Sequence, residues 1–266
     1  MFSFLLLIFS FVKNLNCMNR SLLWCVFLSV AILLSSCKTQ LYHQVNNGRY
    51  YQIDTTIVAD SSILAYYAPY KEQLEIEMNR VIGFAAKELP RGGGAQSLLG
   101  NFFADALLWK GQQLDPEVQA SFATKGGIRA DLRAGDITVG NIFEIMPFEN
   151  AVTILTLSGG DMLRWAEYMA TTGGQPVSGI QLVIEDKKVK EFLIQGKPVD
   201  LAATYKLATY DYLANGGDYV SCFDNPIARS DHPQRIRETL MEYVISRTTQ
   251  GKNIQAQLDG RVQIIR

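Results

Sequence analysis

Residues 97–110 read Ser-Leu-Leu-Gly-Asn-Phe-Phe-Ala-Asp-Ala-Leu-Leu-Trp-Lys, and this stretch is the strongest guide to the fold. Its apolar residues recur with the spacing i, i+3, i+4, i+7 and i+8, at Leu99, Phe102, Phe103, Ala106 and Leu107. Because an α-helix has about 3.6 residues per turn, that spacing places these side chains on one face. We predict a helix over 97–110 with one buried stripe.

The segments on either side of this helix alternate between strand and helix patterns. The β-branched residues of 151–157 are typical of a strand. Further strands are predicted at 81–86, 118–123 and 205–210, two or three between 177 and 199, and one at 261–265; further helices at 69–80, 162–169 and from about 233. The alternation is irregular and no internal repeat is visible. It predicts a single domain of α/β or α+β class, with mixed β-sheets flanked by helices.

The N-terminal segment has the pattern of an export signal. Met18-Asn19-Arg20 precedes an apolar run over 22–34, which ends in Leu34-Ser35-Ser36-Cys37. This resembles a bacterial lipoprotein signal, in which Cys37 would carry the lipid and Met18 would be the true start. A transmembrane helix is the alternative, but the run is shorter than the about 20 residues of a span. We therefore expect a signal over 1–36, a lipidated tether over 37–62 and the folded domain over 63–266, lipid-anchored to a bacterial membrane in the cell envelope.

Composition and cysteine usage exclude several kinds of protein. A net charge of -1 disfavours a general nucleic-acid binder, and 48% hydrophobic residues exclude a disordered chain. With only His43 and His232, the sequence cannot supply a histidine-rich dimetal centre. Of the four cysteines, Cys222 would be the one free thiol of the mature chain, and we expect it in the core.

Three loop segments carry residue types that suit a ligand site: 125–129, 147–150 and 212–218. Glycine pairs let the backbone approach a ligand, an arginine can bind a phosphate or carboxylate, and aromatic rings can stack on a base. None has the spacing of a nucleotide-phosphate or dinucleotide loop. The alternative is that these are ordinary turns and that Phe148 belongs to the core. Asp105 is expected to be structural, and Asp131 to be a solvated turn residue.

Four segments in this order resemble the C-terminal domain of the 5'-nucleotidase family, and the resemblance extends over roughly 70–266. They are Leu99-Gly100-Asn101-Phe102-Phe103-Ala104-Asp105-Ala106, Gly126-Gly127-Ile128-Arg129, the stretch from Ile137-Thr138 to Met146-Pro147-Phe148-Glu149-Asn150, and the stretch from Tyr212 to Asp218. The resemblance implies an α/β domain that holds the nucleoside part of a substrate. In complete enzymes of the family, a preceding metallophosphatase domain holds two metal ions and attacks the phosphate.

The resemblance also implies roles for individual residues. Phe148 and Tyr212 would be the two aromatic walls that clamp the base, although the second position is usually phenylalanine in the family. Arg129 would contact the ribose or phosphate region, and Asn150 would read a base edge. Asp218 would accept hydrogen bonds from ribose hydroxyls.

The same resemblance implies a role for one more residue, and the sequence differs from the usual family pattern at three positions. Gly179 would let the backbone lie close to the base. Thr124 stands where many members have asparagine, and Gln96 where a glutamate is common. The arginine often found upstream would fall near Gly93, whereas Arg91 is out of register.

The 266 residues contain none of the Asp-x-His, Gly-Asn-His-Glu or Gly-His-x-His patterns of the metal domain. We therefore expect no metal or other cofactor in this chain and divalent metals on a partner. The first interpretation is the substrate-binding half of a split 5'-nucleotidase that works with a separate metallophosphatase chain. The alternatives are a lipoprotein that captures nucleosides or nucleotides without chemistry, and a protein-interaction module. Nucleic acid is not an expected partner.

Overall fold

The computed structural model describes residues 24–30, 48, 50–54 and 56–265, and it divides the chain into two units at residues 58 and 59. In the first unit, residues 24–30 are helical. The predicted start at Met18, the predicted lipidation site at Cys37 and most of the predicted signal and tether lie outside the described residues. Among the helices that are described, none is long and apolar enough to cross a membrane.

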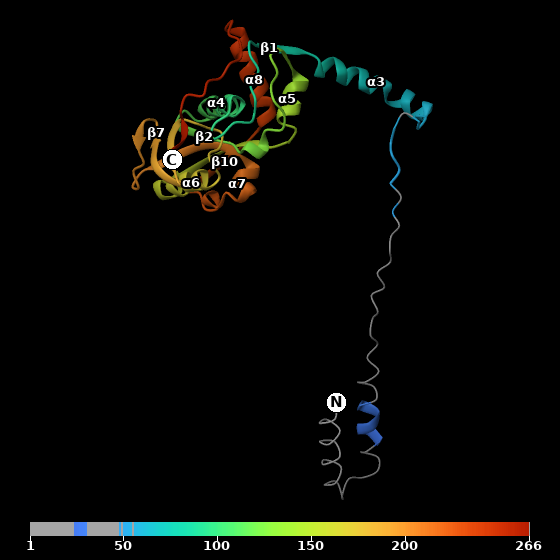
Figure 1. The fold of residues 1–266 in the computed structure, drawn as a ribbon, viewed down its shortest axis with the longest axis horizontal. Coiled ribbons are helices and arrows are strands. Elements are labelled where there is room, and N and C mark those ends of the chain that lie inside the picture. The colour runs from blue at the N-terminus through green and yellow to red at the C-terminus, as the bar shows by residue number, and fades with distance from the viewer. Residues whose placement is uncertain (1–23, 31–47, 49, 55, 266) are drawn as a thin grey trace, which may run out of the picture. The chain divides into compact units, whose positions relative to one another are not determined.

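The second unit contains six helices, three short 3-10 helices and three β-sheets among its described residues (Figure 1). The helices are α3 (Ser61–Met78), α4 (Leu98–Leu114), α5 (Val139–Ile145), α6 (Gly159–Thr171), α7 (Asp211–Ala214) and α8 (Ile236–Thr249). The 3-10 helices are η1 (Lys125–Gly127), η2 (Gly217–Tyr219) and η3 (Ser221–Phe223). This mixed architecture confirms the predicted fold class.

The central sheet has five strands in the order β10-β4-β9-β2-β5. These are β2 (Val118–Phe122), β4 (Ala151–Ser158), β5 (Val177–Ser178), β9 (Thr204–Tyr210) and β10 (Ala228–Arg235). Strands β2 and β9 run parallel, whereas the other neighbouring pairs are antiparallel. A four-stranded sheet has the order β11-β6-β7-β8, from Val262–Ile265, Ile180–Glu185, Lys188–Ile194 and Lys197–Pro198, and β1 (Val81–Ala85) pairs with β3 (Gly135–Thr138).

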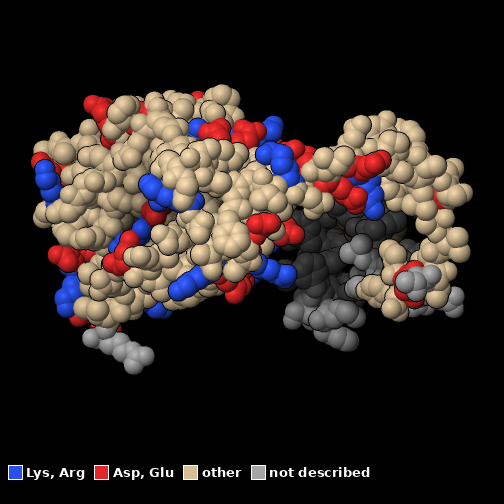
Figure 2. Space-filling model, turned by 90° about the horizontal axis from the view of Figure 1, so that it is seen from above, with Lys and Arg blue, Asp and Glu red and all other residues tan. Residues whose placement is uncertain are grey.

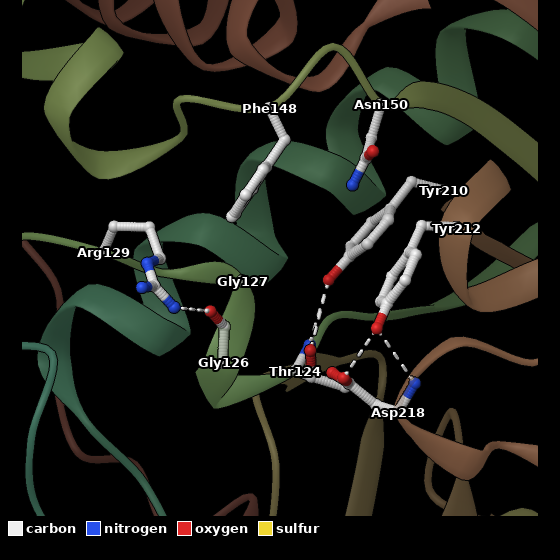
Figure 3. Close-up of a pocket in the computed structure, with 9 residues that line it drawn as sticks. All are labelled: Thr124, Gly126, Gly127, Arg129, Phe148, Asn150, Tyr210, Tyr212 and Asp218. Atoms are coloured by element: carbon white, nitrogen blue, oxygen red, sulfur yellow. Dashed lines mark hydrogen bonds between the residues drawn. The ribbon is translucent and has the colours of Figure 1, made fainter. Parts of the chain in front are cut away.

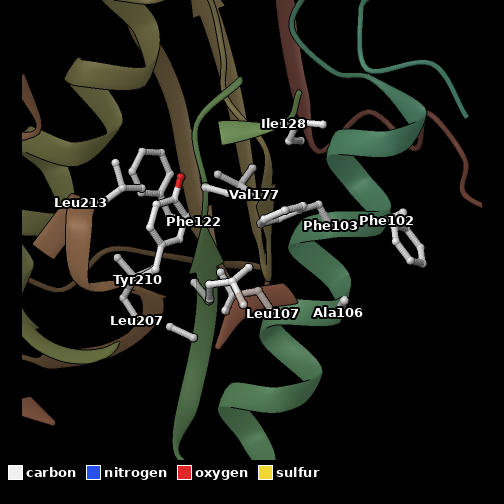
Figure 4. Close-up of a cluster of buried hydrophobic side chains, with 14 of the residues drawn as sticks. Phe102, Phe103, Ala106, Leu107, Phe122, Ile128, Val177, Leu207, Tyr210 and Leu213 are labelled. Carbon is white, nitrogen blue, oxygen red and sulfur yellow. The ribbon is translucent and has the colours of Figure 1, made fainter. Parts of the chain in front are cut away.

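Helices cover both faces of the central sheet at β2. The predicted stripe of α4 is buried, and Figure 4 shows Phe103 and Leu107 on one side of the strand, with Phe122 and Tyr210 on the other. On that second side, the Phe122 ring meets the ring of Trp165 from α6 edge to face, with 5.5 Å between the ring centroids. Helix α4 starts where predicted because the side chain of Ser97 accepts a hydrogen bond from the Gly100 amide at 3.0 Å. The core thus forms between helices and sheet.

The structure also differs from the sequence expectations at several elements. Helix α3 begins at Ser61 rather than at 69, since the Asp60 carboxylate accepts hydrogen bonds from the amides of the first turn. Strand β10 was not predicted, because its residues are mostly exposed and polar, and it forces the next helix to begin at Ile236 rather than near 233. The short elements β3 and α5 were also not predicted. Strand pairing defines β3 and β10, and side-chain caps define the starts of α3 and α5, so none of these elements depends on a hydrophobic period.

The surface carries both signs of charge. Figure 2 shows Lys and Arg interspersed with Asp and Glu on one face of the molecule, as the net charge of -1 would suggest. Cys222 is buried in the core as predicted, and burial raises the pKa of its thiol to about 12. The thiol is therefore protonated at neutral pH and a poor nucleophile.

Candidate functional site

The topology of the central sheet brings the three candidate loops to one edge. Strands β2 and β9 are parallel neighbours, so the chain leaves both of them at the same edge, after Phe122 and Tyr210. Strand β4 is antiparallel to β9 and begins at that edge, where Val152 pairs with Tyr210. The segments that follow β2, precede β4 and follow β9 therefore converge, although they are far apart in the sequence.

A cavity of about 320 Å³ lies between these loops. Its walls combine glycine backbone, two half-exposed aromatic rings, a cation, an amide and a carboxylate (Figure 3). The residues that line it are Thr124, Gly126, Gly127, Arg129, Phe148, Asn150, Tyr210, Tyr212 and Asp218. Five of the six predicted substrate-binding residues are thus in one cavity, and the sixth, Gly179, is not among them.

The two predicted aromatic walls are accessible to a ligand. Phe148 is 41% exposed and Tyr212 is 47% exposed, so neither ring is enclosed in the core. The Phe148 side chain approaches the cavity from the loop before β4 and the Tyr212 side chain from α7, and the Asn150 amide points into the space between them in Figure 3. The Arg129 guanidinium lies 5.9 Å from the centre of the Phe148 ring and donates to the Gly126 carbonyl at 3.2 Å. This geometry suits a flat ring system bearing a negative charge.

Asp218 is tied to one of these walls. The Tyr212 hydroxyl donates to Asp218 Oδ1 at 3.1 Å, and the Asp218 amide donates to the same hydroxyl at 3.3 Å. Asp218 has a left-handed backbone with φ of 52°, and the Tyr168 hydroxyl donates to its carbonyl at 3.0 Å. A non-glycine residue in this conformation is held by its surroundings, here by two tyrosines. The hydroxyl that phenylalanine would lack therefore links the aromatic wall to the carboxylate.

One buried tyrosine forms the inner wall of the cavity, and it was not predicted as a site residue. Tyr210 is 1% exposed, and its hydroxyl lies 3.3 Å from Thr124 Oγ1 and accepts from the Thr124 amide at 3.4 Å. The Gly127 backbone lies so close to Tyr210 that a Cβ added at Gly127 would be 2.7 Å from the Tyr210 hydroxyl. Thr124, which stands where many family members have asparagine, thus gives the buried Tyr210 hydroxyl a hydrogen-bonding partner. The sequence signal was present, since a tyrosine at the end of an apolar strand needs a polar partner.

The buried tyrosine predicts a loss of stability in alkali. Burial raises the pKa of Tyr210 to about 12, whereas a tyrosine in the unfolded chain ionises near 10. Between these values the unfolded state binds fewer protons, so the free energy of unfolding falls as the pH rises. From pH 8 to pH 11 we expect Tyr210 to contribute about 1 kcal/mol to that fall.

Urea unfolding at both pH values measures this effect. Tyr210→Phe, which has no phenol to ionise, should lose about 1 kcal/mol less than the unsubstituted protein. Equal losses in the two proteins would show that Tyr210 ionises normally.

A second residue missed by the sequence interpretation joins two walls of the cavity. The Asp211 carboxylate accepts from the Ala151 amide at 3.1 Å and from the Tyr212 amide at 2.8 Å. It therefore ties the start of β4 to the segment that carries Tyr212. Its place directly before the predicted loop gave no sign of this contact, which depends on the pairing of β4 with β9.

Gly179, which the resemblance implied to lie close to the base, is not among the residues that line this cavity. It joins β5 to β6 with φ of 81° and lines a separate cavity that includes Gln195 and Arg261. A Cβ at this position would lie 2.1 Å from the Gln119 carbonyl oxygen. The structure accounts for the glycine by its backbone conformation and its packing against β2.

The structure also shows the contacts of the other residues that differ from the family pattern, and those of two aspartates discussed above. The Gln96 side chain donates to the Val262 carbonyl at 2.9 Å and holds the last strand. Arg91 donates to the Ile128 carbonyl at 3.2 Å, so its guanidinium lies beside the backbone that precedes Arg129. Asp131, expected to be a solvated turn residue, accepts from the Arg91 amide at 2.7 Å. Asp105 is structural as expected, since it is paired with Arg261.

The described residues contain no group of three or more His, Cys, Asp or Glu side chains arranged to hold a metal ion. The cavity itself offers one carboxylate, from Asp218, together with the Arg129 cation. This donor set suits hydrogen bonding to an organic ligand better than metal coordination.

Comparison with known proteins relates the chain to nucleotidases. The family model "5'-nucleotidase, C-terminal domain" matches residues 81–225. Protein UshA of Escherichia coli K12 is 28% identical over 180 residues, which cover 64% of this chain and 32% of UshA. A 5'-nucleotidase of Vibrio cholerae is 28% identical over 197 residues, which cover 68% of this chain and 34% of that protein. The chain thus spans about a third of the length of these relatives.

Solved structures show the same fold. The crystal structure of a 5'-nucleotidase precursor from Thermus thermophilus superposes with a TM-score of 0.66 at 28% identity, covering 77% of this chain and 42% of that one. The NAD nucleotidase of Haemophilus influenzae gives a TM-score of 0.60 at 19% identity, covering 77% of this chain and 41% of that one, which supports the fold alone. Together with the family match over more than half of the sequence, these findings show that the chain belongs to the 5'-nucleotidase C-terminal domain family.

Proposed function

We propose that the cavity binds the nucleoside part of a nucleotide. The observation that carries the proposal is the convergence of five residues from three distant loops on one cavity: Arg129, Phe148, Asn150, Tyr212 and Asp218. Together they supply the stacking, hydrogen-bonding and charged groups that a nucleotide requires. The family match to a 5'-nucleotidase C-terminal domain supports the same assignment, since the resemblance implies that this domain holds the nucleoside part of the substrate.

The base would lie between the two half-exposed rings, where stacking contributes about 1–3 kcal/mol per base. The Asn150 amide carries both a donor and an acceptor, so it can read a base edge. The Asp218 carboxylate only accepts, which suits ribose hydroxyls. Its Oδ1 already accepts from Tyr212, so Oδ2 is the oxygen that remains for the sugar. Arg129 would face the phosphate or the ribose.

At the level of the whole reaction, the chain would act as the substrate-binding half of a split 5'-nucleotidase. A separate metallophosphatase chain would supply two divalent metals, an activated water and stabilisation of the leaving oxygen. The family match supports the substrate-binding part of this arrangement, because it relates residues 81–225 to the C-terminal domain of 5'-nucleotidases. The lipid on Cys37 would place the reaction at a membrane of the cell envelope.

Mixing the purified protein with candidate metallophosphatase chains and measuring phosphate release from AMP tests the partnership. We expect release to rise only when both chains and a divalent metal are present. Arg129→Ala should lower the release, whereas Arg133→Ala, which removes an arginine outside the cavity, serves as the control. If no chain binds the protein and release never rises, the split-enzyme proposal fails.

A second candidate is capture of nucleosides or nucleotides without chemistry. It is favoured by one observation: two aromatic rings, an amide, a cation and a carboxylate already meet in one cavity. Calorimetry with adenosine, AMP and UDP-sugars, without any partner, distinguishes the two functions. Tight binding by the chain alone supports capture, whereas binding that strengthens with the metallophosphatase present supports the split enzyme.

A further inference from the structure

The loop that carries Phe148 and Asn150 contacts the start of α8 on the side that faces away from the cavity. Phe148 and Asn150 line the cavity, while Glu149 between them pairs with two arginines of the α8 start. Arg237 Nη2 lies 2.6 Å and Arg235 Nε 2.8 Å from the Glu149 carboxylate.

The backbone of the loop is held by the same helix start. Arg237 Nη1 donates to the Phe148 carbonyl at 3.4 Å, and the Ile236 amide donates to the Asn150 carbonyl at 2.9 Å. Three consecutive residues, 235–237, therefore hold three consecutive residues, 148–150. Because the first amides of a helix lack partners within the helix, the bond from Ile236 also satisfies one of them.

Arg237 is fixed in place more firmly than a surface arginine. Its side chain is only 6% exposed, and its guanidinium lies 4.0 Å from the centre of the Phe143 ring of α5. A planar guanidinium stacked on a ring keeps its orientation, so its two donor groups reach the loop from a fixed position. Arg237 thus connects α5, α8 and the loop that carries one aromatic wall.

We infer that Arg237 and Glu149 are a positioning pair that fixes the Phe148–Asn150 loop in the conformation that binds a nucleoside. The inference rests on the proposed function of the cavity. Neither residue lines the cavity, so the pair would act through Phe148 and Asn150 rather than by touching the ligand. Removing the carboxylate would free the loop to move and would weaken binding.

The chain contains a matched control on the same helix. Lys110 of α4 is 7% exposed and pairs with Glu242 of α8, so this is a second buried cation held by a more exposed carboxylate. Glu149→Ala and Glu242→Ala therefore each leave one buried cation without its carboxylate. Neither Lys110 nor Glu242 lines the cavity.

The experiment measures three quantities in both variants: the midpoint of thermal unfolding, the affinity for adenosine and AMP, and amide hydrogen exchange over 148–151. We expect comparable shifts of the midpoint in both variants. Only Glu149→Ala should accelerate exchange in the loop, and only it should weaken binding, by about tenfold. Adding Phe148→Ala to Glu149→Ala should give less than the sum of the two losses, because the pair acts through that ring.

Arg237→Lys serves as a second variant should Glu149→Ala fold poorly, since it keeps the charge but loses the two-pronged contact. It should also accelerate loop exchange. Equal exchange and equal affinity in Glu149→Ala and Glu242→Ala would overturn the inference. If the unsubstituted protein binds no nucleoside, the proposed function fails, while loop exchange still decides whether the pair holds the loop.

Discussion

Tyr212→Ala is expected to weaken nucleoside binding by about 5- to 150-fold, which corresponds to ~1–3 kcal/mol. The substitution removes a ring that is half exposed in the cavity, and with it the hydroxyl that donates to Asp218. The base would lose one stacking surface, and the carboxylate would lose a contact that holds it. Calorimetric titration with adenosine measures the change.

Two control variants separate the ring from its hydroxyl and from general effects of the substitution. Tyr212→Phe keeps the stacking surface, so its affinity should lie closer to that of the unsubstituted protein. Tyr219→Ala removes a ring that is 94% exposed and does not line the cavity, and it should leave the affinity unchanged. Unchanged affinity in Tyr212→Ala would remove Tyr212 from the site and leave the aromatic clamp without its second wall.

Gly179→Ala is the substitution expected to cost the most stability, about 2–4 kcal/mol in the free energy of unfolding. Two effects add at this position. The φ of 81° is unfavourable for any residue with a side chain, and the new Cβ would lie 2.1 Å from the Gln119 carbonyl oxygen. A backbone oxygen in a sheet cannot move aside as the end of a flexible side chain can. Denaturant unfolding measures the loss.

Gly173→Ala isolates the first of these effects. Gly173 has φ of 71°, but nothing lies within 4 Å of an added Cβ, so only conformational strain of about 1 kcal/mol is expected. A loss in Gly179→Ala no larger than that in Gly173→Ala would show that the contact with β2 relaxes. Were Gly179→Ala to keep its stability and lose nucleoside binding, the role near the base implied by the resemblance would hold instead.

The sequence predicted elements with a strong hydrophobic period better than elements defined by their neighbours. The stripe of α4 was visible because its burial repeats every three or four residues. Strand β10 was not visible, because its exposed polar residues form a strand only through pairing with β4. The sequence predicted a helix start at Pro69, although α3 begins earlier, at Ser61 after its Asp60 cap.

The candidate site likewise contains residues that the sequence predicted and residues that only the tertiary structure revealed. Five residues carried over from the family motifs do lie in one cavity, whereas Gly179 does not. Tyr210 and Asp211 were missed because their contacts, with Thr124 and Ala151, cross between strands. The positioning contacts of Arg237 likewise join residues 88 and 89 positions apart in the chain.

The sequence alone determined the fold class, the family and the residue types of the site, since hydrophobic period and motif order are properties of neighbouring residues. Only the tertiary structure decided which of these residues share a cavity. The parallel pairing of β2 with β9, and the antiparallel pairing of β4 with β9, place three loops at one sheet edge. Strand pairing depends on backbone hydrogen bonds between distant segments, so no local pattern records it.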